Sequence, residues 1–210
     1  SNFNTNSPNT VNYTSAIAQT IRNTTYRTLT ISGGGVKTLG GVTTINTNLQ
    51  VTAGTFAPST FNFTVNGTTN IDGTYSDASN TGTNTFVGSV TISASGTWTT
   101  TSSTATGTYV FRGGIVNNAA SFAAGGATFN TNSQALSGST TLSFANIVTV
   151  TGAAVVVTNN GTVTITSTAA ASLAGTGGWT QGTGSTLNYA GSTLTVTTKN
   201  FSANANTFNY

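Results

Sequence analysis

Short runs in which apolar and small polar side chains alternate recur along the whole chain. In each run Leu, Ile, Val or Phe points to one side of an extended backbone and Thr, Ser or Asn points to the other, as in a half-buried β-strand. We expect strands within five such runs: Thr28–Ser32, Thr60–Gly67, Ser89–Gly96, Thr162–Ser167 and Ser192–Thr198. Clusters of Gly, Asn and Ser lie between the runs and indicate turns.

The composition supports an all-β fold and excludes several functions. Threonine accounts for 50 of the 210 residues, whereas only 3% of the residues are charged, against about 25% in an average domain. β-branched residues favour strands, and the common helix formers are nearly absent. Five scattered basic residues make no patch, so the net charge of +3 does not indicate nucleic-acid binding. No apolar run approaches the length of about 20 residues that a membrane-spanning helix needs, so we expect no membrane insertion.

Recurring phrases indicate how the strands are arranged. A tetrapeptide of the type Thr-apolar-Asn-aromatic occurs at Thr10–Tyr13, Thr60–Phe63, Thr186–Tyr189 and Thr207–Tyr210. The interval from Thr186 to Thr207, between the last two copies, is a suitable length for one coil of a β-helix. Repeated phrases favour stacked rungs because the strands of a sandwich occupy different environments. We therefore predict a parallel β-solenoid of roughly 20–25 residues per coil, with a pilin-like β-sandwich as the alternative.

The chain ends with a phrase similar to the one near its beginning. Asn-Phe and then Thr-apolar-Asn-Tyr occur in both places, and Thr10 and Thr207 are 197 residues apart. We predict that residues 1–210 form a single solenoid unit, slightly longer than one period of a tandem array, with 2–13 equivalent to 200–210. The predicted assembly or repeat seam consists of Asn2, Phe3, Thr10, Asn12, Tyr13, Asn200, Phe201, Thr207, Phe208, Asn209 and Tyr210.

Several longer segments resemble a known class of proteins. The segments NTVNYTSAIAQTI, YRTLTISGGGVKTLGG, FTVNGTTNIDGTY and GSVTISASGTW are similar to the β-strand repeats of very large secreted bacterial surface proteins. Such repeats occur in Bacteroidota-type giant adhesins and are loosely akin to filamentous-haemagglutinin and autotransporter-passenger domains. The resemblance implies a parallel β-solenoid stalk or filament that is exported to the cell surface and used in adhesion, motility or matrix building. It implies no catalytic residues.

The residues needed for common kinds of catalysis are scarce. Without His or Cys the chain has no conventional catalytic triad and no transition-metal site. Asp72 and Asp77 are its two carboxylate side chains, and we expect both to be solvated in a loop between strands rather than to form a calcium or acid–base site. Trp98, Trp179, Tyr26, Tyr75 and Tyr109 could stack on sugars, but we expect them to cap a solenoid corner or fill the core. We therefore predict no enzymatic activity, cofactor or metal.

These observations lead to an expected function. We expect a secreted, cell-surface structural protein whose main partner is itself, through end-to-end continuation and lateral packing in a filament. A cell-surface or carbohydrate ligand is a further partner class. Two alternatives stay open: a pilin-like subunit that assembles by strand addition, and an ice-binding solenoid with Thr-x-Thr pairs on a flat face. Against ice binding, the pairs do not recur at a constant spacing in the sequence.

Overall fold

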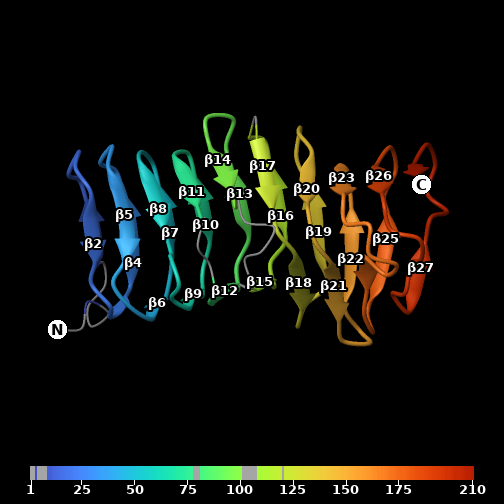
Figure 1. The fold of residues 1–210 in the computed structure, drawn as a ribbon, viewed down its shortest axis with the longest axis horizontal. Helices are drawn as coiled ribbons and strands as arrows, with labels where there is room; N and C mark the ends of the chain where they lie inside the picture. The colour runs from blue at the N-terminus through green and yellow to red at the C-terminus, as the bar shows by residue number, and fades with distance from the viewer. Residues whose placement is uncertain (1–2, 4–8, 78–80, 101–107, 120) are drawn as a thin grey trace.

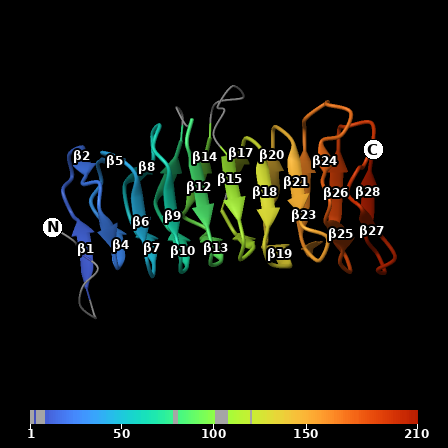
Figure 2. The ribbon, with the colours of Figure 1, turned by 90° about the horizontal axis from the view of Figure 1, so that it is seen from below.

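The chain forms a parallel β-solenoid. The computed structural model describes residues 3, 9–77, 81–100, 108–119 and 121–210. The chain winds through about nine turns, which stack along one axis from the N-terminal to the C-terminal end (Figure 1). Every pairing between neighbouring strands of the described residues is parallel, and consecutive strands lie in different sheets (Figure 2). The predicted solenoid is therefore confirmed, and the alternative of a β-sandwich is wrong.

Each turn contributes strands to three sheets. We call them the first, second and third sheets because they begin with β1, β2 and β3, respectively. The first sheet contains β1 (Thr10–Tyr13), β4 (Thr28–Ile31), β7 (Leu49–Val51), β10 (Thr69–Ile71), β13 (Val90–Ile92), β16 (Ile115–Asn117), β19 (Gln134–Ser137), β22 (Val156–Asn159), β25 (Gly178–Gln181) and β27 (Thr198–Asn200). The second sheet contains β2 (Gln19–Ile21), β5 (Val36–Leu39), β8 (Thr55–Ala57), β11 (Thr74–Ser76), β14 (Thr97–Thr99), β17 (Ser121–Ala124), β20 (Leu142–Phe144), β23 (Thr162–Ile165), β26 (Thr186–Tyr189) and β28 (Thr207–Asn209). The third sheet contains β3 (Thr25–Tyr26), β6 (Thr43–Ile45), β9 (Phe63–Val65), β12 (Thr83–Phe86), β15 (Thr108–Phe111), β18 (Ala127–Asn130), β21 (Val148–Thr151) and β24 (Leu173–Ala174).

The length of a turn varies, while the pairing between strands stays in register. Thr10 pairs with Thr28 and Val90 pairs with Ile115, so the second of these turns is longer in sequence than the first. The corners between strands take up this difference. Thr186 and Thr207 are direct partners, so the coil length that the repeated tetrapeptide predicts is confirmed at this place.

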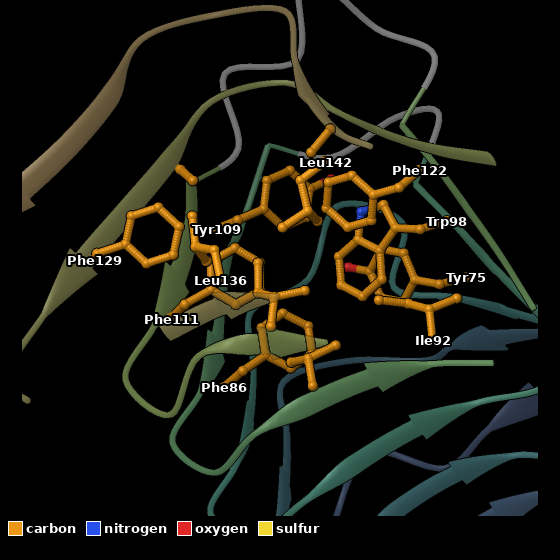
Figure 3. Packing of buried hydrophobic residues seen from close by; sticks show 14 of the residues in the cluster. Tyr75, Phe86, Ile92, Trp98, Tyr109, Phe111, Phe122, Phe129, Leu136 and Leu142 are labelled. Atoms are coloured by element: carbon orange, nitrogen blue, oxygen red, sulfur yellow. The ribbon is translucent and has the colours of Figure 1, made fainter. Parts of the chain in front are cut away.

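Inward-facing side chains of successive turns stack into columns that form the core. In the second sheet Phe56, Tyr75, Trp98 and Phe122 are consecutive partners, and we call them the aromatic column. The rings of Tyr75 and Trp98 are nearly parallel, with centroids 3.9 Å apart. A second stack of Phe86, Phe111 and Phe129 comes from the third sheet and faces the aromatic column across the interior (Figure 3). Such stacking adds about 0.5–1.5 kcal/mol per pair to the effect of burying the rings.

Three of the five predicted strands differ from expectation. In Ser89–Gly96 only Val90–Ile92 is a strand, because a turn over residues 93–96 follows it. In Thr60–Gly67 only Phe63–Val65 is a strand, because Ser59, with a φ of 61°, and Thr60 form a turn just before it. In Ser192–Thr198 the prediction is wrong except at its last residue, which begins β27. Leu194 makes one isolated bridge to Leu173 there, since β24 in the preceding turn is only two residues long and offers little edge to pair with.

Polar side chains outside the core also pair from one turn to the next. Asn66 donates to Asn46 at 3.1 Å, and Asn209 donates to Asn188 at 2.7 Å. Polar side chains therefore also link neighbouring turns along the axis at these positions. The described part of the chain contains no helix, and so none that is long and apolar enough to span a membrane.

Candidate functional sites on the ends and faces of the solenoid

The two aspartates lie in different environments. Asp72 follows β10 and is exposed, as expected. The expectation for Asp77 is wrong: it follows β11 in phase with the inward-facing Tyr75, and its side chain is 1% exposed. The segment between the two aspartates is also not a loop, because it contains β11. Among the described residues no three His, Cys, Asp or Glu side chains gather where they could hold a metal ion.

The aromatic residues considered for sugar stacking are all in the core. Trp98, Trp179, Tyr26 and Tyr75 are 0% exposed, and Tyr109 is 1% exposed. The prediction that they fill the core is confirmed, and a sugar platform built from them is excluded because none of their rings is accessible.

Lys37 is a buried cation that the sequence analysis did not single out. Its side chain is 0% exposed and occupies the position beside Phe56 at the start of the aromatic column. Its Nζ donates to the carbonyl oxygens of Ser15 at 2.8 Å, Gly35 at 3.0 Å and Ile17 at 3.2 Å. Three acceptors match the three N–H donors of an ammonium group, so the charge is satisfied by backbone alone. Lys37 therefore fastens the loop after β1 to the next turn.

The N-terminal part of the predicted seam lies on the first turn. Asn2 is outside the described residues. Phe3 forms a single bridge with Tyr26, and their rings are stacked with centroids 5.7 Å apart. Thr10, Asn12 and Tyr13 belong to β1 in the first sheet, and the hydroxyl groups of Tyr13 and Tyr26 are 3.1 Å apart.

The C-terminal part of the predicted seam lies on the last turn. Asn200 ends β27, Phe201 follows it, and β28 contains Thr207, Phe208 and Asn209 just before Tyr210. The two similar phrases thus occupy different sheets, with Thr10–Tyr13 in the first and Thr207–Asn209 in the second. The 197-residue period and its seam stay a prediction.

Within the described residues, the end strands of the first and second sheets pair on one side only. β1 and β2 close one end of the first and second sheets, and β27 and β28 close the other. Such edges carry unpaired N–H and C=O groups that can accept another strand. At the C-terminal edge the inward column of Val157 and Trp179 ends in Lys199, which is exposed, while Phe208 is 37% exposed.

The outer face of the second sheet is uniform and uncharged. All outward-facing residues of its ten strands are Thr, Ser, Ala, Asn or Val. One position of this face is Thr or Ser in eight turns, and we call it the threonine column. It consists of Thr55, Thr74, Thr97 and Ser121, then Thr141 one residue before β20, and Thr162, Thr186 and Thr207.

A hollow of about 290 Å³ opens at the C-terminal end of the same sheet. It is lined by Thr164, Ile165, Thr166, Asn188, Tyr189, Ala190, Asn209 and Tyr210. The lining offers hydroxyl, amide and aromatic groups and no charged side chain.

Comparisons with protein-family models, with curated proteins and with solved structures find no match. Any proposal about function therefore rests on the geometry of this chain.

Proposed function

We propose that this chain is a structural, non-catalytic unit of an extracellular filament or giant repeat adhesin. The observation that carries the proposal is the pair of long sheets with uncharged outer faces, whose turns stack in register from the first described turn to the last. A rod of this kind transmits load along its axis through backbone hydrogen bonds and stacked side chains. The scarcity of charge removes electrostatic repulsion between turns and between rods that pack side by side.

Of the two ways to lengthen such a rod, covalent continuation is favoured by Lys199. A strand from a separate molecule would have to pair with β27, where the apolar column ends in this exposed cation. Lysine on an edge strand is a common protection against unintended pairing. A following turn of the same chain would be held at high effective concentration and could supply acceptors for the ammonium, as the backbone does for Lys37.

The first prediction concerns the size and place of the native protein. An antibody against residues 1–210 is applied to intact cells that make the protein, and separately to an extract of the same cells boiled in denaturant. We expect the antibody to label the surface of intact cells and to detect material of very high mass in the denatured extract. A discrete band at the mass of residues 1–210 alone would exclude the covalent array, and labelling only after cell lysis would exclude the surface location.

The threonine column makes ice binding a second candidate function. Sequence spacing argued against it, because the interval from Thr74 to Thr97 is longer than the interval from Thr55 to Thr74. The register shows that this objection does not hold, since the corners absorb the extra residues and the side chains still align. Aligned strands repeat about every 4.8 Å along the axis, and residues two apart in a strand are about 6.6 Å apart. Hydroxyl groups aligned at the first of these spacings are suited to ordered water, and in some turns, such as that of Thr97 and Thr99, a second hydroxyl lies at the other spacing.

The second prediction tests this candidate by thermal hysteresis and ice-crystal shape. If the second sheet binds ice, purified protein will shape ice crystals, and Thr97→Lys will abolish the effect by placing a strongly hydrated charge in the threonine column. The matched control is Thr180→Lys, a half-buried outward threonine of the first sheet, which should leave the effect unchanged. Wild-type protein that neither shapes ice nor depresses its growth temperature would reject the candidate and leave the structural proposal standing.

A further inference from the structure

A cluster of polar side chains lies inside the solenoid near its middle turns. Asn84 on β12 is 0% exposed and donates from Nδ2 to Oδ2 of Asp77 at 2.8 Å. The hydroxyl of Tyr109 on β15 donates to the same oxygen at 2.8 Å, and that of Tyr75 on β11 approaches it at 3.4 Å. The cluster therefore joins the second sheet to the third across the core.

Two oxygen atoms of this cluster have no donor among the described residues. They are Oδ1 of Asp77 and Oδ1 of Asn84, both buried. Each belongs to a planar group, and the two groups are already joined by the bond from Nδ2 of Asn84. An ionised carboxylate only accepts hydrogen bonds, so in that state both oxygens stay unsatisfied, at a cost of about 1–3 kcal/mol each. Turning the Asn84 amide over does not help, because its oxygen would then face Oδ2 of Asp77.

A single proton on Asp77 supplies the hydrogen-bond donor that the two oxygen atoms lack. A protonated carboxyl group carries a donor on one oxygen and an acceptor on the other, and the amide of asparagine carries the complementary pair. In the pair proposed below, Oδ1 of Asp77 carries the proton and donates to Oδ1 of Asn84, while Oδ2 continues to accept from Nδ2. Oδ2 is then the carbonyl oxygen, which also accepts from the tyrosine hydroxyls.

The electrostatic surroundings favour the protonated acid below about pH 6. Burial raises the pKa of Asp77 from 3.8 to about 6, although the hydrogen bonds from Tyr109, Asn84 and Tyr75 act in the opposite direction. No basic side chain of the described residues contributes to this shift, and the chain has no histidine. Burial, together with the neighbouring Tyr109 and Asp77, raises the pKa of Tyr75 well above 10, so Tyr75 stays a neutral donor.

We propose that Asp77 and Asn84 form a proton-dependent acid–amide pair, which fastens the middle turns of the solenoid when Asp77 is protonated and weakens when it ionises. Because the folded state holds this proton more tightly than the unfolded chain, it binds more protons between about pH 4 and pH 6. Stability therefore rises as the pH falls through this window. This is the opposite of the usual behaviour of a paired carboxylate, which loses stability in acid.

The third prediction is a pH-dependent unfolding midpoint that depends on Asp77. We expect the urea midpoint of the wild type to be higher at pH 5 than at pH 7.5. Asp77→Asn can make the same two hydrogen bonds as an amide pair, and it should remove this pH dependence and match the wild type at pH 5. The control is Asp72→Asn, which changes the same charge at an exposed position and should leave the pH dependence in place.

A measurement on the wild type guards against a variant that fails to fold. With only two aspartates and no glutamate, ¹³C labelling of the aspartate carboxyls gives two side-chain signals. We expect the signal of Asp77 to titrate near pH 6 in the folded protein. Titration of that signal below pH 4.5, or a urea midpoint that does not fall between pH 5 and pH 7.5, would overturn the proposal.

Discussion

Replacement of Trp98 by alanine is expected to lower the free energy of unfolding by about 3–5 kcal/mol, as for large aromatic residues truncated in other cores. Trp98 is fully buried in β14 and contacts rings above and below it, with Tyr75 at 3.9 Å and Phe122 at 5.6 Å between centroids (Figure 3). It also faces Phe86 across the core at 5.5 Å. Alanine would leave a cavity that these stacked rings, which are held by their own strands, cannot close.

The position of Trp98 in a middle turn of the rod makes its replacement more destabilising. In a stack of turns, stability is the sum of the turns and of the interfaces between neighbours. A defect in a middle turn weakens two interfaces at once and divides the rod into two shorter stacks, each with fewer neighbours. We therefore expect the unfolding transition of Trp98→Ala to be broader as well as earlier.

The free energy of unfolding is measured by urea titration followed by circular dichroism. Two variants serve as controls. Thr99→Ala changes the adjacent outward residue and should alter the free energy of unfolding by less than about 0.5 kcal/mol. Trp98→Phe keeps a stacked ring and removes the indole N–H, which has no hydrogen-bond partner among the described residues. Its free energy of unfolding should therefore fall by less than that of Trp98→Ala. Equal losses for Trp98→Phe and Trp98→Ala would show that ring stacking does not stabilise this column.

Much of the fold could be predicted from the period-2 pattern. In Thr28–Ile31 it places Leu29 and Ile31 inside, and both are fully buried. The repeated tetrapeptide predicts the partners Thr186 and Thr207, because side chains that stack in one column face similar surroundings. The threonine column could not be found from spacing, since an inserted corner residue changes the sequence interval without changing the register.

The wrong expectation for Asp77 and the omission of Lys37 have a common cause. Lys37 and Asp77 lie in phase with the inward residues Leu39 and Tyr75, so the alternation predicts that they are buried. The general rule that charged residues stay outside points the other way. What the sequence does not contain is the compensation: the three carbonyl oxygens around Lys37 come from the loop after β1 and the corner before β5, and the amide beside Asp77 comes from β12, a strand of another sheet. Their positions depend on the register, which only the folded structure provides.

Replacement of Gly138 by alanine is the second prediction with a large effect, at about 2–5 kcal/mol of unfolding free energy. Gly138 follows β19 at a corner and has a φ of 125°, a value that residues with a side chain rarely adopt. A Cβ atom at this position would lie 1.9 Å from the carbonyl oxygen of Asn117 in the preceding turn. The obstacle is backbone rather than a flexible side chain, so two turns would have to move apart and lose their register at this corner.

Alanine variants of two other glycines distinguish the effect of backbone strain from the effect of close contact between turns. Their stability is measured from urea midpoints in the same way. Gly34 has no positive φ, and a methyl group added to it would meet nothing within 4 Å, so Gly34→Ala should change stability by less than about 0.5 kcal/mol. Gly184 has a φ of 71° but the same open space, so Gly184→Ala should lose only about 1–2 kcal/mol from the left-handed backbone. If contact between turns is what requires glycine at corners, Gly138→Ala must be the most damaging of the three. A loss no greater than that of Gly184→Ala would show that the turns are free to separate there.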